Sequence, residues 1–298
     1  MENLGSDEYA NPEALVSTQW LASHLDDPSV RVVDARYNVR PTGKGSFEAI
    51  SGRSEFEKDH IPGAVFVDVH SDLSDPDCPL YILGPKRFEE FMGRLGIGAD
   101  KTVVVYDDHG GTWSARLWWA LRYYGHDKVR LLNGGYRRWR EEGHAVEKTV
   151  TSPKIERFQA CVRPELRVSR DDVLRAIDKE QTVIVDALPA PFYRGTLRLY
   201  PGHRAGHIPG AINVPSPSNV DPETHLILAA PRLTDVWRSA MLSPEQRIIT
   251  YCGGGVYASF AFFALHLLGH ENVALYDGSW MEWGADPDLP IETDPHRS

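Results

Sequence analysis

The chain contains the phrase His60-Ile61-Pro62-Gly63-Ala64 and, roughly half of its 298 residues later, the phrase His207-Ile208-Pro209-Gly210-Ala211. Three other pairs of landmarks recur in the same order around these two phrases. They are Val33-Asp34-Ala35 with Val185-Asp186-Ala187, Leu132-Asn133-Gly134-Gly135 with Tyr276-Asp277-Gly278-Ser279, and Trp139 with Trp283. One five-residue match can arise by chance, but a collinear series of matches predicts two copies of one domain.

Each copy alternates short apolar or β-branched runs with segments of helical apolar spacing. In the first copy we expect strands at 30–33, 65–67, 102–106 and 129–132, and helices at 85–95, 114–124 and 137–142. In the second copy we expect strands at 182–185, 211–214, 247–251 and 273–275, and helices at 169–177, 234–241, 256–268 and 279–283. This alternation predicts an α/β fold in which each domain is a parallel sheet flanked by helices on both faces.

The length of 298 residues is also that of about two domains. We place the first domain at 12–143 and the second at 165–292. Residues 144–164 lack a clear period and are expected to form an extended linker, long enough to wrap around a domain. Ser169 is the expected start of a helix, and Gly96, Gly125 and Gly269 are expected to end helices.

The chain is acidic, with 42 Asp and Glu against 32 Lys and Arg and a formal net charge of -10. Such a charge gives no basic surface for a phosphate backbone or an anionic membrane, so neither nucleic acid nor a membrane is an expected partner. The N-terminal residues are polar and acidic and do not resemble a secretory signal. Residues 256–268 are apolar but too short to span a bilayer.

Three cysteines, Cys78, Cys161 and Cys252, are an odd number for a disulfide framework. A reducing compartment therefore fits the chain better than an oxidising one, and a cytoplasmic location is expected. No spacing of cysteine and histidine matches a metal site, so no metal is expected.

Cys252 is the strongest candidate for a reactive group. It ends an apolar strand and is followed by the active-loop candidates Gly253, Gly254, Gly255, Val256 and Tyr257. Three glycines allow the backbone to curl with positive φ, so that N–H groups form an anion-binding nest at the start of a helix. Such groups stabilise a thiolate and are expected to lower the pKa below about 8.5.

Other interpretations of this loop fit less well. A buried structural cysteine is the ordinary alternative, but three consecutive glycines argue against it. A phosphate-binding loop would need Gly-Lys-Ser/Thr, and a cysteine phosphatase would need an arginine where Ala258 stands. A dinucleotide fold requires Gly-x-Gly-x-x-Gly and no cysteine nucleophile.

With its repeated Asp-Ala and His-Ile-Pro-Gly-Ala signatures, its Cys252 loop and its Tyr276-Asp277-Gly278-Ser279-Trp280-x-Glu282-Trp283 segment, the chain resembles the tandem-domain rhodanese-like sulfurtransferases. This family includes thiosulfate and 3-mercaptopyruvate sulfurtransferases. The resemblance implies that only the second domain is catalytic, because the position of Cys252 falls near Asp107 in the first. It also implies transfer through a Cys252 persulfide to a thiol, cyanide or thioredoxin-like acceptor, without a cofactor.

The loop indicates the small-molecule donor by the same resemblance. Thiosulfate enzymes place cationic side chains directly after the cysteine, whereas mercaptopyruvate enzymes have a neutral Cys-Gly-Ser-Gly-Val-Thr loop. The neutral residues after Cys252 favour 3-mercaptopyruvate, with thiosulfate as the second candidate. Gly254 and Tyr257 depart from the family pattern, since they replace a serine and a threonine.

The substrate arginines of mercaptopyruvate enzymes are also replaced, because their positions fall on Phe192 and about Tyr200. Arg194 and Arg198 lie nearby and are our candidates for a rebuilt anion-binding site, with an ordinary exposed arginine as the alternative for each. Arg204 is more typical of a surface arginine.

The family's first-domain partners fall on His70 and Tyr81, which are therefore further substrate-binding candidates. His70 has a pKa near 6.5 that suits proton transfer, although it could equally be a surface histidine. Asp186 ends a strand next to the expected active loop and is a candidate for orienting it. His60 and His207 occur in both copies, so we interpret them as structural.

Two other functions stay open at this stage. The missing arginines are compatible with a persulfide relay or binding module that receives sulfur from a partner protein. A degenerate rhodanese-like scaffold with an inert Cys252 is the third hypothesis, and a thiol pKa at or above about 8.5 would support it.

Overall fold

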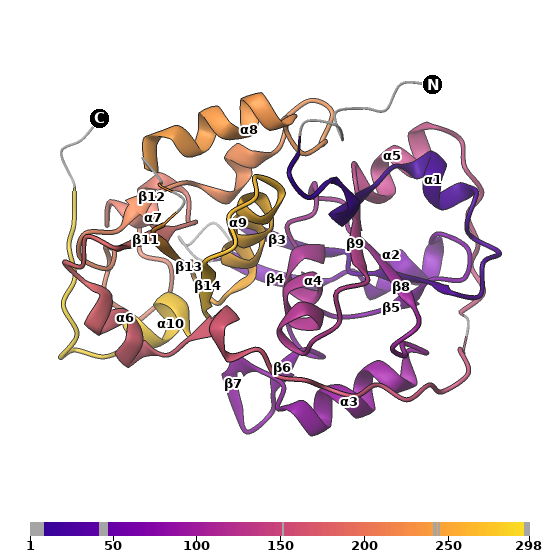
Figure 1. Ribbon diagram of the computed structural model, residues 1–298, viewed down its shortest axis with the longest axis horizontal. Helices are drawn as coiled ribbons and strands as arrows, with labels where there is room; N and C mark the ends of the chain where they lie inside the picture. The colour runs from indigo at the N-terminus through magenta and orange to yellow at the C-terminus, as the bar shows by residue number, and fades with distance from the viewer. Residues whose placement is uncertain (1–8, 42–46, 151, 241–242, 244, 295–298) are drawn as a thin grey trace.

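The computed structural model describes residues 9–41, 47–150, 152–240, 243 and 245–294, which form two α/β halves side by side (Figure 1). The sheet of the first half has the strand order β1-β9-β8-β2-β5. These strands are β1 (Leu15–Val16), β2 (Val30–Asp34), β5 (Val65–Phe66), β8 (Thr102–Tyr106) and β9 (Val129–Leu132). All neighbouring pairs run parallel.

The sheet of the second half has the order β10-β14-β13-β11-β12, and its pairs are also parallel. Its strands are β10 (Arg167–Val168), β11 (Thr182–Asp186), β12 (Ile212–Asn213), β13 (Arg247–Tyr251) and β14 (Val273–Tyr276). The two orders are identical when the copies are aligned by their repeated phrases. The predicted duplication of one parallel α/β domain is therefore confirmed.

Helices cover both faces of each sheet. The first half contains α1 (Thr18–Ala22), α2 (Arg53–Lys58), α3 (Pro85–Arg94), α4 (Ser114–Tyr123) and α5 (Gly135–Glu141). The second half contains α6 (Arg170–Ala176), α7 (Ala190–Tyr193), α8 (Ala230–Trp237), α9 (Val256–Leu267) and α10 (Ser279–Trp283). Each half has its own outer hydrophobic cluster, and a third cluster runs through both halves.

Helices α4 and α9 lie side by side between the two sheets (Figure 1). They follow the equivalent strands β8 and β13, and nearly all of their residues are buried. Trp118 of α4 packs edge-on against Phe263 of α9, with ring centroids 4.8 Å apart. The apolar segment 256–268 is therefore buried because its helix packs against the other domain. No helix among the described residues could cross a membrane.

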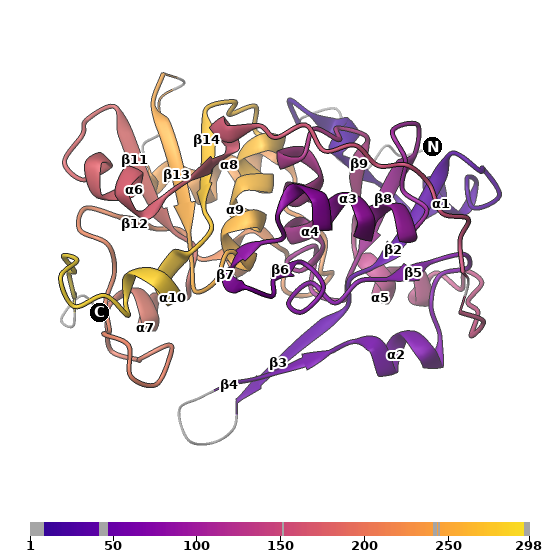
Figure 2. The ribbon, with the colours of Figure 1, turned by 90° about the horizontal axis from the view of Figure 1, so that it is seen from below.

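The structure contains elements that the hydrophobic pattern did not reveal. Strands β3 (Tyr37–Pro41) and β4 (Phe47–Ser51) form a hairpin that projects from the first domain (Figure 2). A second hairpin joins β6 (Ser74–Asp75) to β7 (Cys78–Ile82). The edge strands β1 and β10 have only two residues each, too few for a pattern.

Most expected helix ends are confirmed. Gly96, Gly125 and Gly269 have φ of +69°, +84° and +87°, as expected of residues that end helices. Ser169 forms a capping box with Asp172. Helix α8 begins at Ala230, earlier than expected, because Pro231 is well tolerated in a first helical turn.

The segment between the domains lies along the first domain. Glu156 N–H donates to the Gly93 carbonyl at 3.0 Å, and Cys161 N–H donates to the Tyr124 carbonyl at 2.9 Å. Phe158 is buried and packs edge-on against Phe88. The extended segment is thus part of the first domain's surface.

His60 and His207 have the same structural role in the two copies. The Nδ1 atom of each is 2.7 Å from a carbonyl oxygen, that of Phe56 or that of Tyr193. Each also pairs through its backbone with a glutamate far along the chain, His60 with Glu147 and His207 with Glu292.

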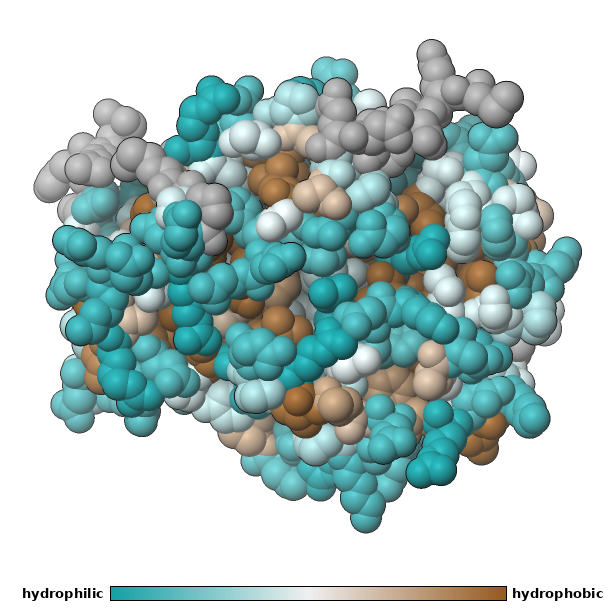
Figure 3. Space-filling model, in the orientation of Figure 1, coloured by the Kyte–Doolittle hydropathy of each residue, from teal (hydrophilic) through white to brown (hydrophobic). Residues whose placement is uncertain are grey.

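The exterior seen in Figure 3 is mainly hydrophilic, with smaller hydrophobic areas between the polar residues.

Candidate active site

Cys252 lies directly after β13 and before α9, at the carboxyl end of the second sheet. Its backbone N–H donates to Ser279 Oγ at 3.2 Å, and its carbonyl accepts from Trp280 N–H at 2.9 Å. The Gly253 carbonyl accepts from Met281 N–H at 2.9 Å. The start of α10 therefore fixes the backbone of the active loop.

Three backbone N–H groups are directed at the cysteine sulfur, those of Gly254 and Gly255 from the expected loop and that of Ala258 from beyond it. Burial raises the pKa of the Cys252 thiol, whose residue is only 2% exposed, and the N–H groups of Ala258, Gly254 and Gly255 lower it. The negative charge of Asp186 raises it further. We expected a pKa below 8.5, but burial outweighs these N–H groups, so the pKa of the thiol is raised instead.

The three glycines of the loop serve different purposes. Only Gly255 has a positive φ, +82°. A Cβ at Gly253 would lie 2.8 Å from atoms of both Leu199 and Tyr200, so a larger residue does not fit there. Gly254 is exposed, and the atoms nearest to a Cβ there are 3.8 Å away. The packing of the loop therefore requires glycine at Gly253 and its backbone conformation favours glycine at Gly255, whereas Gly254 has room for a side chain.

The equivalent loop of the first domain holds a carboxylate in the same kind of nest. Asp107 accepts hydrogen bonds from the N–H groups of His109, Gly111, Trp113 and Ser114 at 2.7 to 3.0 Å. The first domain thus carries an anion at the position of the cysteine. This internal comparison shows that the loop geometry is suited to a negative charge at this position.

An aliphatic and an aromatic side chain, Leu199 and Tyr200, lie against Gly253 of the active loop. Phe192, Leu199 and Tyr257 are partly buried and pack against the hydrophobic cluster that contains Cys252. Burial and the charge of Cys252 raise the pKa of the Tyr200 and Tyr257 hydroxyls. Both hydroxyls therefore keep their protons near neutral pH.

The arginine candidates lie on the segment that follows α7. Arg194 is half-buried and directly follows the helix, whereas Arg198 is exposed. Among the residues that the structure describes, neither side chain forms an ion pair, so both are available to an anion. Arg204, in contrast, donates to three backbone carbonyls, which makes it a structural residue.

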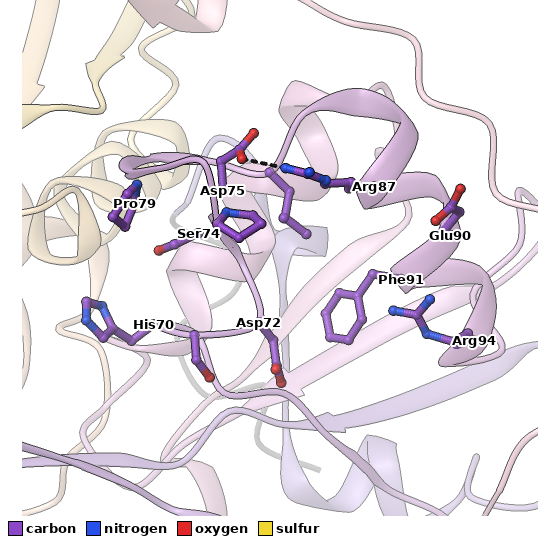
Figure 4. A pocket seen from close by; sticks show the side chains of 12 residues that line it. His70, Asp72, Ser74, Asp75, Pro79, Arg87, Glu90, Phe91 and Arg94 are labelled. Atoms are coloured by element: carbon purple, nitrogen blue, oxygen red, sulfur yellow. Dashed lines mark hydrogen bonds and ion pairs between the residues drawn. The ribbon is translucent and has the colours of Figure 1, made fainter.

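The first-domain candidates are held in other environments. His70 is exposed and lies at a cavity of about 510 Å³ whose lining includes Asp72, Arg87 and Arg94 (Figure 4). Tyr81 donates to Glu282 Oε1 at 2.6 Å, so its hydroxyl joins β7 to α10. His70 therefore lines this cavity, whereas Tyr81 forms a contact between the two domains.

Asp186 is fully buried beneath the active loop. One of its oxygens accepts from Leu188 N–H at 2.8 Å, and burial raises its pKa to about 7. Its first-domain counterpart, Asp34, is paired with Arg36 at 2.7 Å, but Leu188 stands where Arg36 would be. The second domain has therefore lost the cation that would neutralise this carboxylate.

Ser279 is a site residue that the sequence analysis did not single out. Its hydroxyl accepts from Cys252 N–H and donates to the Tyr276 carbonyl at 2.8 Å. It has φ of +50°, a conformation that favours glycine, and its first-domain counterpart is Gly135 with φ of +58°. The replacement of a repeated glycine by serine was the available signal.

The duplicated fold, the cysteine at a strand end and its nest define a two-domain α/β protein with one thiol site. The model of the rhodanese-like domain matches residues 17–142 and 169–286. The chain belongs to the rhodanese-like family and is a sulfurtransferase. No group of His, Cys, Asp and Glu in the described part of the chain is arranged to hold a metal ion.

Similar proteins cover nearly the whole chain. It is 38% identical to 3-mercaptopyruvate sulfurtransferase of Escherichia coli K12, over 93% of this chain and 97% of that protein. It is 37% identical to sulfur carrier protein TtuD of Thermus thermophilus, over 95% and 98%. The crystal structure of SseA from Escherichia coli, a 3-mercaptopyruvate sulfotransferase, superposes with a TM-score of 0.79 and 34% identity, over 90% and 98%.

Proposed function

We propose that the chain moves sulfane sulfur through a persulfide on Cys252. The nest of N–H groups around its sulfur is the observation that carries this proposal. A persulfide spreads its charge over two sulfur atoms and ionises more readily than a thiol. The nest therefore stabilises the loaded enzyme more than the resting thiol, as catalysis by preorganised donors requires.

The first half-reaction is proposed to take 3-mercaptopyruvate as donor. The Cys252 thiolate attacks the donor sulfur, an S–S bond forms, and the C–S bond breaks with its electron pair leaving as the enolate of pyruvate. The enolate takes up a proton to give pyruvate. With thiosulfate, the second candidate, the broken bond is S–S and the leaving group is sulfite.

The second half-reaction is proposed to deliver the outer sulfur to a thiol, cyanide or a thioredoxin-like protein. A thiolate acceptor attacks the outer sulfur, and Cys252 leaves as a thiolate into the same nest. The three cysteines are free, which supports a reducing compartment and a cytoplasmic location.

The neutral loop supports the donor assignment, as do Arg194 and Arg198, which have no ion pair with any residue that the structure describes. Gly254 is exposed, so the loop is open toward a small molecule at this residue. Arg194 and Arg198 are the proposed partners of the donor carboxylate. His70, Tyr81 and Asp186 are the other proposed substrate-binding residues, of which His70 suits proton transfer and Asp186 can orient the loop.

Pyruvate release from 3-mercaptopyruvate, with a small thiol as acceptor, tests this function. The unchanged chain should release pyruvate, and Cys252→Ser should release none. Cys161→Ser is the matched control, because Cys161 is exposed and its N–H bonds to the first domain. Equal activity of Cys252→Ser and the unchanged chain would refute the proposal, as would absence of activity with both donors.

A persulfide relay is the second candidate function. Phe192 and Tyr200 stand where the family resemblance places arginines, and Leu197 on the same segment is 50% exposed. The relative named as a sulfur carrier protein also supports it. A relay should accept sulfur faster from a protein persulfide than from 3-mercaptopyruvate, and Phe192→Arg should increase small-donor turnover. High turnover of 3-mercaptopyruvate by the unchanged chain would exclude it.

The inert scaffold is distinguished by the alkylation rate of Cys252. A rate that follows an ionisation below about pH 8.5 indicates an activated thiol and excludes the scaffold. A thiol pKa at or above about 8.5, the direction in which burial moves it in this fold, would support the scaffold hypothesis.

A further inference from the structure

The active loop rests on a charged pair that joins the two domains. Arg116 lies on α4 of the first domain, and Asp277 follows β14 of the second. Arg116 Nη2 lies 2.6 Å from Asp277 Oδ1, and the two side chains are 5% and 0% exposed. A Cβ at Gly255 would lie 2.7 Å from Arg116 Nη1 and 3.2 Å from Asp277 Oδ1. Both charged groups therefore touch the third glycine of the loop.

The two partners differ in how fully they are bonded. Asp277 also accepts from Ile82 N–H at 2.8 Å and lies 3.5 Å from Arg167 Nε. Arg116 Nη1 is buried and has no hydrogen-bond partner among the described residues. An unpaired buried N–H group lowers the stability of the fold. The stability of the Arg116–Asp277 ion pair therefore does not by itself explain why the Arg116 guanidinium lies against Gly255.

The duplication supplies an internal comparison for one side of this arrangement. Ile82 N–H of the first domain donates to Asp277, and Ile227 N–H of the second domain donates to Asn133 at 3.0 Å. Asn133 and Asp277 occupy the same position in the two copies. The backbone contacts across the interface are therefore repeated, but the carboxylate is present only on the cysteine side.

The residue under the loop differs between the two sides in the same way. A Cβ at Gly111 of the silent loop would lie 3.1 Å from Phe260 Cε2 of α9. Phe260 thus supports the silent loop from the second domain as Arg116 supports the catalytic loop from the first. The silent side uses a phenylalanine and an asparagine, and the cysteine side uses an ion pair.

We propose that Arg116 is a positioning residue for the sulfur-transfer loop, supplied by the first domain through its pair with Asp277. The planar guanidinium binds Asp277 through one nitrogen and supports Gly255 with the other. This contact keeps Gly254 and Gly255 N–H directed at the Cys252 sulfur when the sulfur becomes charged. The domain without a nucleophile therefore contributes to catalysis in the other domain.

The test exchanges the charged pair for the pair found on the silent side, in the full chain. Arg116→Phe with Asp277→Asn should fold, with a melting temperature within about 4 °C of the unchanged chain. The thiol pKa of Cys252, measured by iodoacetamide alkylation against pH, should rise by about one unit, and alkylation at pH 7 should slow about tenfold. An unchanged alkylation profile in the folded double variant would overturn the proposal.

Two further variants separate positioning from general packing. Phe260→Leu removes a similar contact on the silent side and should leave the alkylation profile unchanged, so an equal slowing would overturn the proposal. Arg116→Lys keeps the positive charge, but a single ammonium group cannot contact both Asp277 and Gly255. The pKa of the Cys252 thiol in this variant should lie between its values in the unchanged chain and in the double variant. If the double variant does not fold, an unchanged profile in Arg116→Lys overturns the proposal. The inference rests on Cys252 as nucleophile, but alkylation needs no sulfur donor, so failure of sulfur transfer is distinguished from failure of positioning.

Discussion

Ser279 offers a quantitative test of how the second domain holds its cysteine. The backbone of Ser279 has φ of +50°, and its hydroxyl accepts a hydrogen bond from the buried Cys252 N–H. Ser279→Ala removes the hydroxyl and keeps the backbone strain. The unpaired N–H should cost about 1–3 kcal/mol in the free energy of unfolding, and the loop should be less ordered around the sulfur.

Ser279→Gly is the matched variant because the first domain has Gly135 at this position, with φ of +58°. Glycine loses the same hydrogen bond but relieves about 1–2 kcal/mol of left-handed strain. Its greater freedom in the unfolded chain returns about 0.5–1 kcal/mol of that gain. The glycine variant should therefore be about 1 kcal/mol more stable than the alanine variant, yet both should alkylate more slowly than the unchanged chain.

Urea unfolding gives the two free energies, and iodoacetamide alkylation reports the thiol. Gly135→Ala is the reciprocal control, because a Cβ there would collide with the Asp107 carbonyl, and it should be strongly destabilising. The reasoning is refuted if the alanine variant is as stable as the unchanged chain. It is also refuted if the alanine variant equals or exceeds the stability of the glycine variant.

Three other predictions follow from the same site. Gly254→Ser should leave the free energy of unfolding within about 0.5 kcal/mol and increase turnover of 3-mercaptopyruvate relative to thiosulfate; a large loss of stability would show that the loop has no room. Burial raises the pKa of Asp186 to about 7 in the folded chain, against an ordinary value of 3.8 in the unfolded chain. Its contribution to stability is therefore greatest below pH 3.8 and is lost as pH rises to 7, by up to about 4 kcal/mol. Asp186→Asn should remove that loss in unfolding experiments between pH 4 and 7 and should lower the pKa of the Cys252 thiol, and an unchanged pH dependence would contradict the burial argument. Asp107→Ala should lower the free energy of unfolding by about 3 kcal/mol or more, because it leaves several buried N–H groups unpaired. A change below about 0.5 kcal/mol would show that these hydrogen bonds do not stabilise the first domain.

The repeat was sufficient to predict the fold because both copies keep the residues that end strands and turn the chain. The Asp-Ala and His-Ile-Pro-Gly-Ala phrases mark equivalent strand ends and histidine contacts, which the structure shows in both halves. Within the described residues the second copy has no equivalent of the β3–β4 hairpin, so the repeat carried no information about it. The two-residue edge strands depend on pairing with distant neighbours and have no pattern of their own.

The site was predictable where chemistry is local in sequence. Cys252 and its glycines are consecutive, so the nest could be expected from the loop alone. The direction of the thiol pKa could not, because it depends on how deeply the fold buries the sulfur and on the charge of Asp186, which comes from another strand. Arg116 could not be found either, because it reaches the loop across the domain interface.

The central claim is that Cys252 alone carries the transferred sulfur. The most direct test is to incubate the full chain with 3-mercaptopyruvate or thiosulfate and to measure the mass of the protein and of its cysteine peptides. The account predicts a gain of about 32 Da, one sulfur atom, on the Cys252 peptide, with none in Cys252→Ser. A gain on the Cys78 or Cys161 peptide instead, or no gain with either donor, would contradict it.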